Sequence, residues 1–569
     1  MLGQLPVEIL LQITGYLDNE TLTNLYQLCC RLYHVIGPRL REIYRTKTVD
    51  LGAIKRDQEL DIRPHLTDRR TLKFVEELIF QDYSGDLYTG IYCSHHVKGR
   101  GKDLGLALMP LFRGLKRNSL VSFSWNLRAC IPHQILGPRG YLRRHQRNIE
   151  RVSLKTGWCP GDTDPSGKLS ISRFHRLRSL SWTGISTINH CIALTELFAV
   201  NAHCLEELEL GLNSLPQRLA KWRDLQKDWM KARNAFAFKI LQLQQNQSQA
   251  VFPWLRKLSL YGVDFRYAFT EMAYAFQLHK LQALKFRRCY FSSDVLRTIA
   301  EIADNDTIQL ASLDIKLNPY SNRDLDSFQR FFALSMPNLE DVFIHVEAYD
   351  QTSLKTHLRS IFALGRNLKR FVYHSHLDVE GDLAGAWEPT EAPMVWDDEI
   401  LTLLSNANLQ CFGLCDQLPS LRFHLSQHSP MTWEILHVRS LPTMHLEYQP
   451  HNPGTFHLDF DFDAPFTPPP NSLFDPAPYR PNFTAAEITD LLAFASWAFG
   501  PRGLPKLDLL VLGEVDTVRC LGPSGSYSIC LTRNTDVSTR IQFPYRQVMP
   551  GDEEIRREFQ AHEDFFKTG

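Results

Sequence analysis

The sequence predicts an α/β fold in which a small N-terminal three-helix module precedes an irregular solenoid of parallel strands and helices. Three observations lead to this prediction. Apolar residues recur at helical spacing near the N-terminus, a short apolar motif then returns with a period in the twenties, and helix-like segments separate its copies. A chain of 569 residues is also too long for one ordinary globular core, which favours repeats or several domains.

The first helix of the module is indicated by an apolar stripe of Leu5, Ile9, Ile13 and then Tyr16 or Leu17. Pro6 suits the first turn of this helix, where a missing N–H costs nothing. The stripe therefore predicts an amphipathic helix at the start of the chain.

Two further helices are expected to complete the module. Asp18 or Asn19 can cap the second helix, which carries on one face Leu22, Leu25 and Leu28. A third helix from about Cys30 is expected to stop at Gly37–Pro38. Three short helices form a marginal core, so the module should share its apolar surface with a partner or act as a cap on the body.

The repeat motif of the body is apolar-x-x-apolar-x-apolar. Its thirteen usable copies start at Val75, Leu120, Ile149, Leu177, Leu205, Leu255, Leu281, Leu310, Leu339, Leu368, Leu409, Trp433 and Leu507. Steps of 29, 28 and 28 residues run from Leu120 to Leu205, and steps of 26, 29, 29 and 29 run from Leu255 to Leu368. Because chance matches to so short a motif are common, the near-constant period is the stronger sign of stacked strand-plus-helix repeats.

Helix-like segments precede the regular motif copies. The segments are SSDVLRTIAEIA before Leu310, RDLDSFQRFFAL before Leu339, TSLKTHLRSIFAL before Leu368 and TAAEITDLLAFASWAFG before Leu507. In the last of these, Thr484 and Glu487 form a capping box and Gly500 can end the helix. The alternation of helix and strand predicts parallel strands that helices cover.

Two copies extend the motif to a longer consensus, with Asn213 after Leu205 and Asn318 after Leu310, and Cys289 takes the same position in a third. On these residues the body resembles irregular leucine-rich repeats. The other ten copies lack the Asn or Cys, so other groups must supply the hydrogen bonds to the backbone of their turns.

Three insertions interrupt the repeats, and they set the expected domain boundaries. A polar, helix-rich insertion covers about 216–250, an acidic insert runs from Asp378 to Trp396, and residues 449–482 contain nine prolines. We expect the N-terminal module at 1–48, the solenoid at 49–445, a Pro-rich loop at 446–482, terminal repeats or a cap at 483–545 and a charged tail at 546–569. Such inserts are either tolerated surface loops or part of a binding face.

The ordered set of residues in the N-terminal module resembles the F-box. The matching residues are Leu5-Pro6-x-Glu8-Ile9, Ile13, Tyr16-Leu17-Asp18, Leu22, Leu25, Leu28, Cys30-Arg31 and Pro38-x-Leu40. Together with the repeats, the chain is similar to fungal-type F-box receptors. The resemblance implies docking on a Skp-type adaptor and through it a cullin ligase (SCF), with adaptor-contacting or module-core roles for Leu5, Pro6, Ile9, Leu17, Leu22 and Leu25.

A protein substrate could bind the sheet face of the repeats that points away from the helices. In each motif the last two apolar positions point inward, so the residues between and just after them point outward. The resulting candidates are Arg256, Lys257, Tyr261, Lys285, Arg287, Lys316, Phe343, His345 and His374. Basic residues among them could accept acidic or phosphorylated motifs, although an ordinary solvated strand face gives the same pattern.

Composition points away from several classes of protein. Lys plus Arg equals Asp plus Glu at 63 each, so no overall basic excess indicates a nucleic-acid or membrane partner. Met1 to Glu8 lacks the features of a secretory signal, and no segment has the ~20 apolar residues that would span a bilayer. The twelve cysteines are scattered, as reduced core residues are. We expect a cytoplasmic and/or nuclear protein.

Motifs of catalytic appearance all depart from their consensus. The segment Gly522-Pro-Ser-Gly-Ser526 ends in Ser where a nucleophile elbow has Gly, and is expected to be a turn. The segment from Gly99 to Gly105 has one residue too many for a dinucleotide fingerprint, and is expected to be a loop. We therefore predict no catalytic residue and no cofactor.

Possible metal ligands fail on their spacing. Asp459, Asp461 and Asp463 imitate a calcium loop, but Ala464 and Pro470 stand where Gly and Glu are needed. A second set, Cys411, Cys415, His424 and His428, has a central gap of eight residues, short of the usual twelve. No metal site is predicted.

The leading hypothesis is a non-enzymatic substrate receptor of an SCF-type ubiquitin ligase, which would act through proximity. One alternative is a scaffold that binds the adaptor without delivering substrates. Another is an enzyme with an activity in residues 446–569, where the repeats end.

Overall fold

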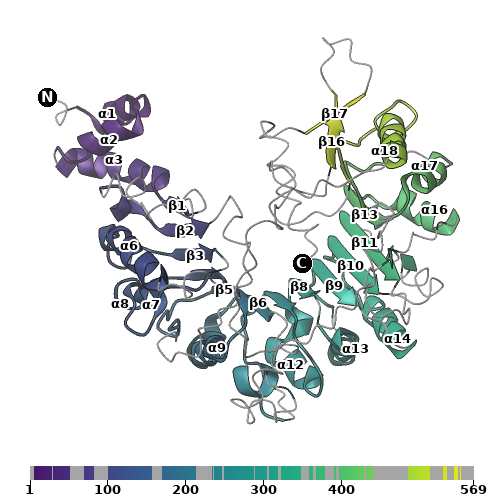
Figure 1. The fold of residues 1–569 in the computed structure, drawn as a ribbon, viewed down its shortest axis with the longest axis horizontal. Helices are drawn as coiled ribbons and strands as arrows, with labels where there is room; N and C mark the ends of the chain where they lie inside the picture. The colour runs from purple at the N-terminus through teal and green to yellow at the C-terminus, as the bar shows by residue number, and fades with distance from the viewer. Residues whose placement is uncertain are drawn as a thin grey trace, which may run out of the picture. The chain divides into compact units, whose positions relative to one another are not determined.

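The computed structural model divides into two compact units, Met1–Leu310 and Ala311–Gly569, which are described one at a time (Figure 1). The structure describes residues 5–28, 30–51, 70–81, 100–127, 129–156, 169–212, 234, 236–245, 249–287, 289–303, 307–317, 322–347, 358–359, 361–362, 367–377, 390–391, 396, 398–427, 431–439, 485–512, 529–534, 544–548 and 552.

The first unit begins with three helices, α1 (Val7–Gly15), α2 (Asn19–Leu25) and α3 (Cys30–Ile43). Asp18 is the N-cap of α2, and its carboxylate accepts a hydrogen bond of 2.7 Å from the amide of Thr21. The prediction that the third helix stops at Gly37–Pro38 is wrong, because α3 continues through Pro38. Ile36 and Leu40 are both fully buried, so packing on either side of Pro38 offsets the lost hydrogen bond.

The strands of the first unit form one parallel sheet in which each strand pairs with the next along the chain. They are β1 (Thr46–Asp50), β2 (Glu77–Gln81), β3 (Ser122–Asn126), β4 (Arg151–Lys155), β5 (Ser179–Ile185), β6 (Glu207–Leu212), β7 (Lys257–Tyr261) and β8 (Ala283–Arg287).

Helices join these strands and cover one face of the sheet (Figure 1). They are η2 (Leu72–Phe74), α6 (Arg100–Gly114), α7 (His133–Leu136), α8 (Tyr141–His145), α9 (Ile188–Asn201), η5 (Ala202–Cys204), η7 (Phe236–Ile240), α12 (Phe269–Phe276), η8 (Leu278–Lys280) and α13 (Ser292–Ala303). The predicted helix before Leu310 is thus confirmed as α13. The loop predicted from Gly99 to Gly105 is wrong over Arg100–Gly105, which starts α6, because Leu104, Leu108 and Leu111 give this segment a buried helical stripe.

The second unit also contains a sheet of successive parallel strands. They are β9 (Ser312–Leu317), β10 (Asp341–Glu347), β11 (Arg370–Leu377), β13 (Cys411–Cys415), β14 (Ile435–Arg439) and β15 (Leu509–Leu512). The short strand β12 (Thr390–Glu391) pairs antiparallel with β11, and β16 (Ile529–Arg533) and β17 (Tyr545–Gln547) continue antiparallel from β15. This final pairing departs from the parallel pattern expected of the repeats.

The second unit's helices are α14 (Asn322–Phe332), α16 (Asp398–Asn406), α17 (Leu418–Ser426) and α18 (Ala485–Ala498). The helices predicted before Leu339 and Leu507 are confirmed as α14 and α18. Of the segment before Leu368, the structure describes four residues as helical, 358–359 and 361–362.

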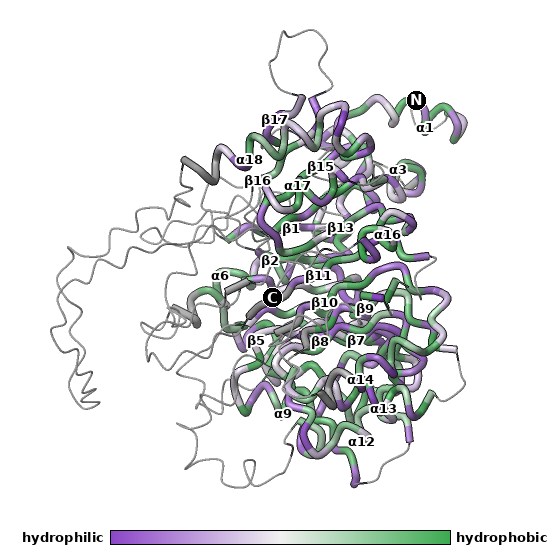
Figure 2. The backbone as a smooth tube through the Cα atoms, turned by 90° about the vertical axis from the view of Figure 1, so that its right-hand side faces the viewer, coloured by the Kyte–Doolittle hydropathy of each residue, from purple (hydrophilic) through white to green (hydrophobic). Residues whose placement is uncertain are grey.

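In each unit a hydrophobic core lies between the sheet and the helices. Each of the thirteen predicted motifs begins two residues before a parallel strand and has its other two apolar positions on that strand, and all these apolar positions are buried. Equivalent positions are in register from strand to strand, as at Leu208↔Leu258 and Leu258↔Leu284. Apolar stretches, green in Figure 2, accordingly recur in one strand after another.

In the first unit, residues that follow two of the strands donate side-chain hydrogen bonds to backbone carbonyls of a neighbouring strand. Cys289, at the consensus position, is buried and its thiol donates to the carbonyl of Leu260 at 3.3 Å. Where the consensus residue is missing, the Thr156 hydroxyl donates to the carbonyl of Gly184 at 3.0 Å and accepts from the indole of Trp182 at 3.0 Å. Thr156, one residue before the consensus position of its repeat, thus supplies the side-chain hydrogen bonds at this turn.

Several predicted segments lie outside the described residues. They are most of the 216–250 insertion, most of 378–396, the Pro-rich loop, the aspartates near Asp461, the Gly522–Ser526 turn, His428, the capping Thr484, the consensus Asn213 and Asn318, and nearly all of the tail. No helix among the described residues is long and apolar enough to cross a membrane.

Candidate functional site

The N-terminal helices share one apolar core with the start of the body. Its buried members are Leu10, Leu22, Tyr26, Leu32, Ile36, Leu40 and Phe74. Phe74 belongs to η2 rather than to the three helices, and its ring lies 5.1 Å from that of Tyr26 in an edge-to-face arrangement. The sequence-based expectation that the module shares its apolar surface therefore holds at its junction with the body.

Two polar contacts strengthen the same junction. The ammonium of Lys73 lies 4.3 Å from the centroid of the Tyr26 ring, a cation–π contact. The guanidinium of Arg70 is 3.5 Å from the side-chain oxygen of Asn24 in α2. The module is therefore held to the residues that lead into β2 by apolar, aromatic and polar contacts together.

Arg39 joins α3 to the end of α1. Its guanidinium, on α3, donates to the backbone carbonyl of Thr14 and, at 3.4 Å, to that of Gly15. These are carbonyls of the last turn of α1, which have no partner within the helix and carry the negative end of its dipole. Arg39 thus serves as a C-terminal cap for α1 from another helix.

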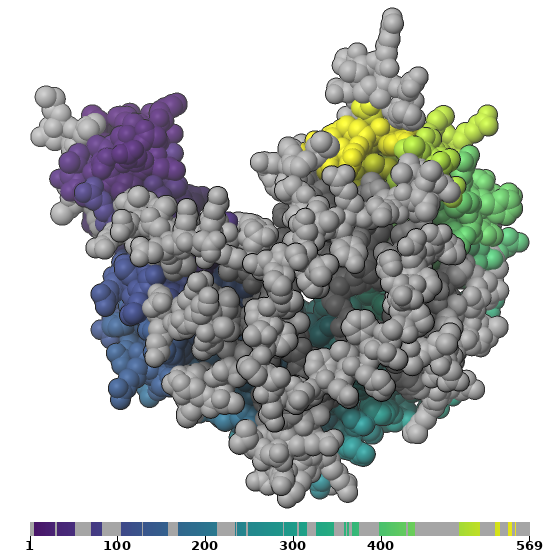
Figure 3. All heavy atoms as spheres, in the orientation of Figure 1, coloured from purple at the N-terminus to yellow at the C-terminus, as the bar shows by residue number. Residues whose placement is uncertain are grey.

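The module exposes large apolar side chains that its own core does not use. The exposed fractions are 42% for Val7, 41% for Ile9, 51% for Leu11, 92% for Tyr16 and 67% for Leu28. The helices of the module are uncovered on the face drawn in Figure 3 (purple). Several large apolar side chains exposed on three short helices are typical of a protein interaction surface.

The structure separates the two roles that the sequence left open for the predicted adaptor-contacting residues. Leu22 is fully buried and belongs to the module core, while Leu5, Leu17 and Leu25 are half-buried against that core. Pro6 and Ile9 are exposed and can contact a partner.

Val7 and Leu11 were missed by the sequence-based prediction, as was the core residue Leu10. The prediction assigned one apolar stripe to this helix, but α1 carries more apolar residues than one stripe can hold. Val7 and Leu11 are four residues apart and so lie on one side of the helix. This surplus of apolar residues was the signal in the sequence for a second, exposed surface.

The outward sheet face of the first unit is polar, as the strand alternation predicts. Glu207 on β6 accepts a hydrogen bond from Ser179 at 3.1 Å and forms an ion pair of 2.7 Å with Lys257. The hydrogen bond from Lys257 lowers the pKa of Glu207 below its ordinary value. Beside this pair, Ser181 donates to Glu209 at 2.6 Å.

The five predicted substrate-binding residues of this unit lie together on β7 and β8 or directly before β7. Arg256 and Lys257 are exposed, and Tyr261 and Lys285 are half-exposed. Tyr261 pairs in register with Arg287, whose side chain is only 7% exposed. Arg256, Lys257, Tyr261 and Lys285 can therefore reach a partner, and their binding role stays a prediction.

The corresponding face of the second unit is apolar. Phe343 and Val372 lie there in one buried cluster with Cys411, Ile435, Leu509, Val511, Cys530 and Val548. Of the predicted residues, Phe343 is 2% exposed and His374 is 0% exposed, and their rings are 5.3 Å apart. His345 is half-exposed and is in register with both Lys316 and His374. The structure thus brings these residues together but leaves Phe343 and His374 without access to solvent.

Comparison with known proteins agrees with the geometry of the N-terminal helices. Residues 2–43 match the F-box-like family. The match covers all of α1, α2 and α3. No curated protein matches the chain.

Proposed function

We propose that this chain is the substrate-recognition subunit of an SCF-type ubiquitin ligase. Its N-terminal helices would dock on a Skp-type adaptor, and its solenoid body would bind protein targets. The observation that carries the proposal is the exposure of three large apolar side chains on the first of the F-box-like helices, with Val7 and Leu11 on one side of it and Ile9 on the other. F-box domains generally bind such adaptors, which join them to a cullin.

The energetics of docking follow from burial. Val7, Ile9 and Leu11 leave two-fifths to one-half of their surface in water, and covering this surface would contribute roughly 1 kcal/mol per side chain. Leu22 and the rest of the module core would contribute indirectly by holding α1 in place.

The chain would contribute to ubiquitin transfer by holding the substrate close to the ligase and in a suitable orientation. In this proposal no residue of the chain takes part in a bond-forming step. The complex would work in the cytoplasm, the nucleus or both.

We also propose that the body belongs to the irregular leucine-rich-repeat kind found in fungal-type F-box receptors. Support comes from the thirteen buried motifs and from Cys289, whose thiol bonds to the turn at a consensus position. Arg256, Lys257, Tyr261 and Lys285 are the accessible members of the proposed target-binding face. Together they place a basic and aromatic surface on β7 and β8.

The test of adaptor docking is a pulldown of the full chain with purified Skp-type adaptor. Ile9→Asp with Leu11→Asp should abolish retention, because charged side chains would then have to be buried in the interface. Leu106→Asp is the matched control, since Leu106 is a 62% exposed leucine on α6 of the body. If the adaptor still retains the double variant, or if it also fails to retain the Leu106→Asp control, docking through α1 is contradicted.

A second measurement separates a ligase subunit from a scaffold that only binds the adaptor. Proteins captured by the full chain would be incubated with the reconstituted cullin complex, and their ubiquitylation followed with wild type and the Ile9→Asp, Leu11→Asp variant. Ubiquitylation that depends on α1 is expected for a substrate receptor. Adaptor binding without any modified partner would favour the scaffold.

A further inference from the structure

Four exposed side chains form a patch where β7 and β8 lead into their helices. They are Arg266, Tyr267, Tyr290 and Phe291, and the exposed fractions of the three aromatic ones are 64%, 50% and 47% in chain order. Arg266 and Tyr267 lie between β7 and α12, while Tyr290 and Phe291 lie between β8 and α13. None of the four was singled out by the sequence.

The patch is contiguous because the two loops are joined. Asp264 and Tyr290 form a parallel β-bridge, and the amide of Phe265 donates to the carbonyl of Tyr290 at 3.1 Å. The guanidinium of Arg266 lies 5.7 Å from the centroid of the Phe291 ring. The hydrogen bond with Asp264 raises the pKa of Arg266.

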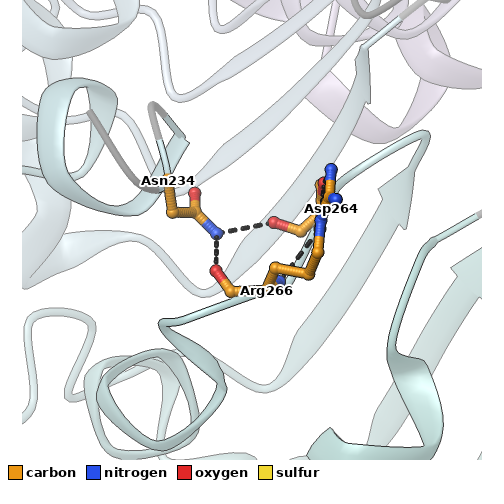
Figure 4. A network of polar contacts seen from close by, with 3 residues as sticks. All are labelled: Asn234, Asp264 and Arg266. Carbon is orange, nitrogen blue, oxygen red and sulfur yellow. Dashed lines mark hydrogen bonds and ion pairs between the residues drawn. The ribbon is translucent and has the colours of Figure 1, made fainter. Parts of the chain in front are cut away.

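A buried asparagine holds the loop between β7 and α12 in place (Figure 4). The side-chain amide of Asn234, 6% exposed, donates to the backbone carbonyls of Asp264 at 2.7 Å and Arg266 at 2.8 Å. Its oxygen accepts from the amide of Ala237 at 2.9 Å. Asp264 in turn accepts from the Nε atom of Arg266 at 2.8 Å. The loop is therefore ordered before any partner arrives, which lowers the entropic cost of binding.

Two of the aromatic residues adopt an unusual backbone conformation. Tyr267 and Phe291 both have φ of 62°, in the left-handed region that favours glycine; Tyr267 stands two residues before α12 and Phe291 directly before α13, in successive repeats. Strain of this kind persists where surrounding structure enforces it, and it is concentrated at sites that bind ligands. Here it displays two large rings to solvent, where a glycine would be more stable.

The segment that contains β7 and β8 is basic. The described part of residues 251–291 contains Arg256, Lys257, Arg266, Lys280, Lys285 and Arg287 against Asp264 and Glu271, while β6 on the other side of β7 carries Glu207 and Glu209. Lys257 forms an ion pair with Glu207, Arg266 forms one with Asp264, and Arg287 is only 7% exposed. The exposed and half-exposed cations are spread over two strands and their flanking residues rather than gathered around one point, which suits several carboxylates better than one phosphate group.

We propose that this patch binds an extended acidic segment of a partner protein, with an aliphatic or aromatic side chain of the segment placed on Tyr267, Tyr290 and Phe291. Asp and Glu residues of the segment would lie along the basic face of β7 and β8. This inference rests on the proposed function and deepens it, because such a segment would be the recognition element of a substrate.

The test starts from a display library of random twelve-residue peptides selected on the full chain. Enriched sequences are expected to contain Asp or Glu around an aliphatic or aromatic residue. The strongest peptide, labelled with fluorescein, would be measured by fluorescence anisotropy. Replacing its Asp and Glu by Asn and Gln should weaken binding at least ten-fold.

The decisive variant is Tyr267→Gly with Phe291→Gly. Glycine accepts positive φ, so the thermal midpoint should stay the same or rise while peptide affinity falls at least ten-fold. Trp254→Gly is the control, because Trp254 is a 65% exposed aromatic residue before the start of β7, whereas the patch follows the end of that strand. It should bind the peptide like wild type.

Several outcomes would overturn the proposal. They are selection of neutral or basic peptides, selection of none, equal binding by the glycine variant, and a single phosphoserine that replaces all the carboxylates without loss. The adaptor pulldown gives an independent result. A chain that binds the peptide but not the adaptor would refute the proposed ligase function and leave this surface intact.

Discussion

The ring of Phe74 packs edge-to-face on that of Tyr26, with 5.1 Å between centroids and 75° between planes. Tyr26 follows α2 of the F-box-like module, whereas Phe74 belongs to η2 at the start of the body. Both are nearly fully buried, at 4% and 6% exposed. The body thus supplies a side chain without which the module's core would be incomplete.

Replacing Phe74 by Ala should therefore destabilise the N-terminal helices by about 3 kcal/mol, the usual cost of removing a buried phenyl ring. Amide hydrogen exchange of the full chain would show faster exchange in α1–α3, with little change in β5–β8. Phe423→Ala is the control, because Phe423 is 61% exposed on α17. Unchanged protection of α3 in the Phe74 variant would mean that the module folds without the body.

Arg39→Ala should loosen the end of α1, because the carbonyls of Thr14 and Gly15 lose their cationic donor. We expect a loss of about 1 kcal/mol in local stability and a similar loss in adaptor affinity. Arg41→Ala, two residues further along the same helix and exposed, is the matched control. Calorimetric titration with the adaptor would measure both variants, and equal affinities would argue against a positioning role for Arg39.

The inward side of the repeats could be predicted from the sequence because two constraints coincide there. A strand residue at the second or third motif position must be apolar to face the helices, and a constant period places it beside its equivalent in the next repeat. Leu208, Leu258 and Leu284 show both constraints, since all are buried and in register.

The outward face could not be predicted in the same way. Strand alternation identifies which residues point outward but not what covers them, so Lys257 and Phe343 were treated alike although one is exposed and the other buried. The patch around Tyr267 was also missed, because its loops follow the motif and have no periodicity. Pro38 shows the reverse error, in which local propensity predicted a helix stop that packing overrides.

Thr156→Val should destabilise the first unit by about 2 kcal/mol. The hydroxyl of Thr156 is the acceptor for the indole N–H of Trp182, and both side chains are buried. Valine keeps the shape but leaves that N–H without its partner, which costs more than the hydrogen bond itself contributes. Thr156→Ser retains the hydroxyl and should lose much less. Urea unfolding would compare the two, and equal losses would show that the methyl group rather than the hydroxyl matters.

Asp416 should make the second unit less stable as pH rises. Burial raises the pKa of this carboxyl from 3.8 to about 6, although hydrogen bonds from Trp396 and the amide of Gln417 oppose the shift. A raised pKa means that the folded state holds the proton more tightly than the unfolded state. The stabilising contribution is therefore complete below about pH 4 and disappears as pH rises through 6.

The shift of roughly two pH units corresponds to roughly 3 kcal/mol, an upper limit for the effect. Asp416→Asn cannot ionise, so its advantage over wild type should grow between pH 5 and pH 7.5. Thermal melts of both proteins across this range would measure the difference. A constant difference would mean that Asp416 is ionised in the folded and unfolded states alike across that interval, so that its pKa in the folded state is not raised. Its hydrogen bonds with Trp396 and Gln417 would then account for its whole contribution to stability.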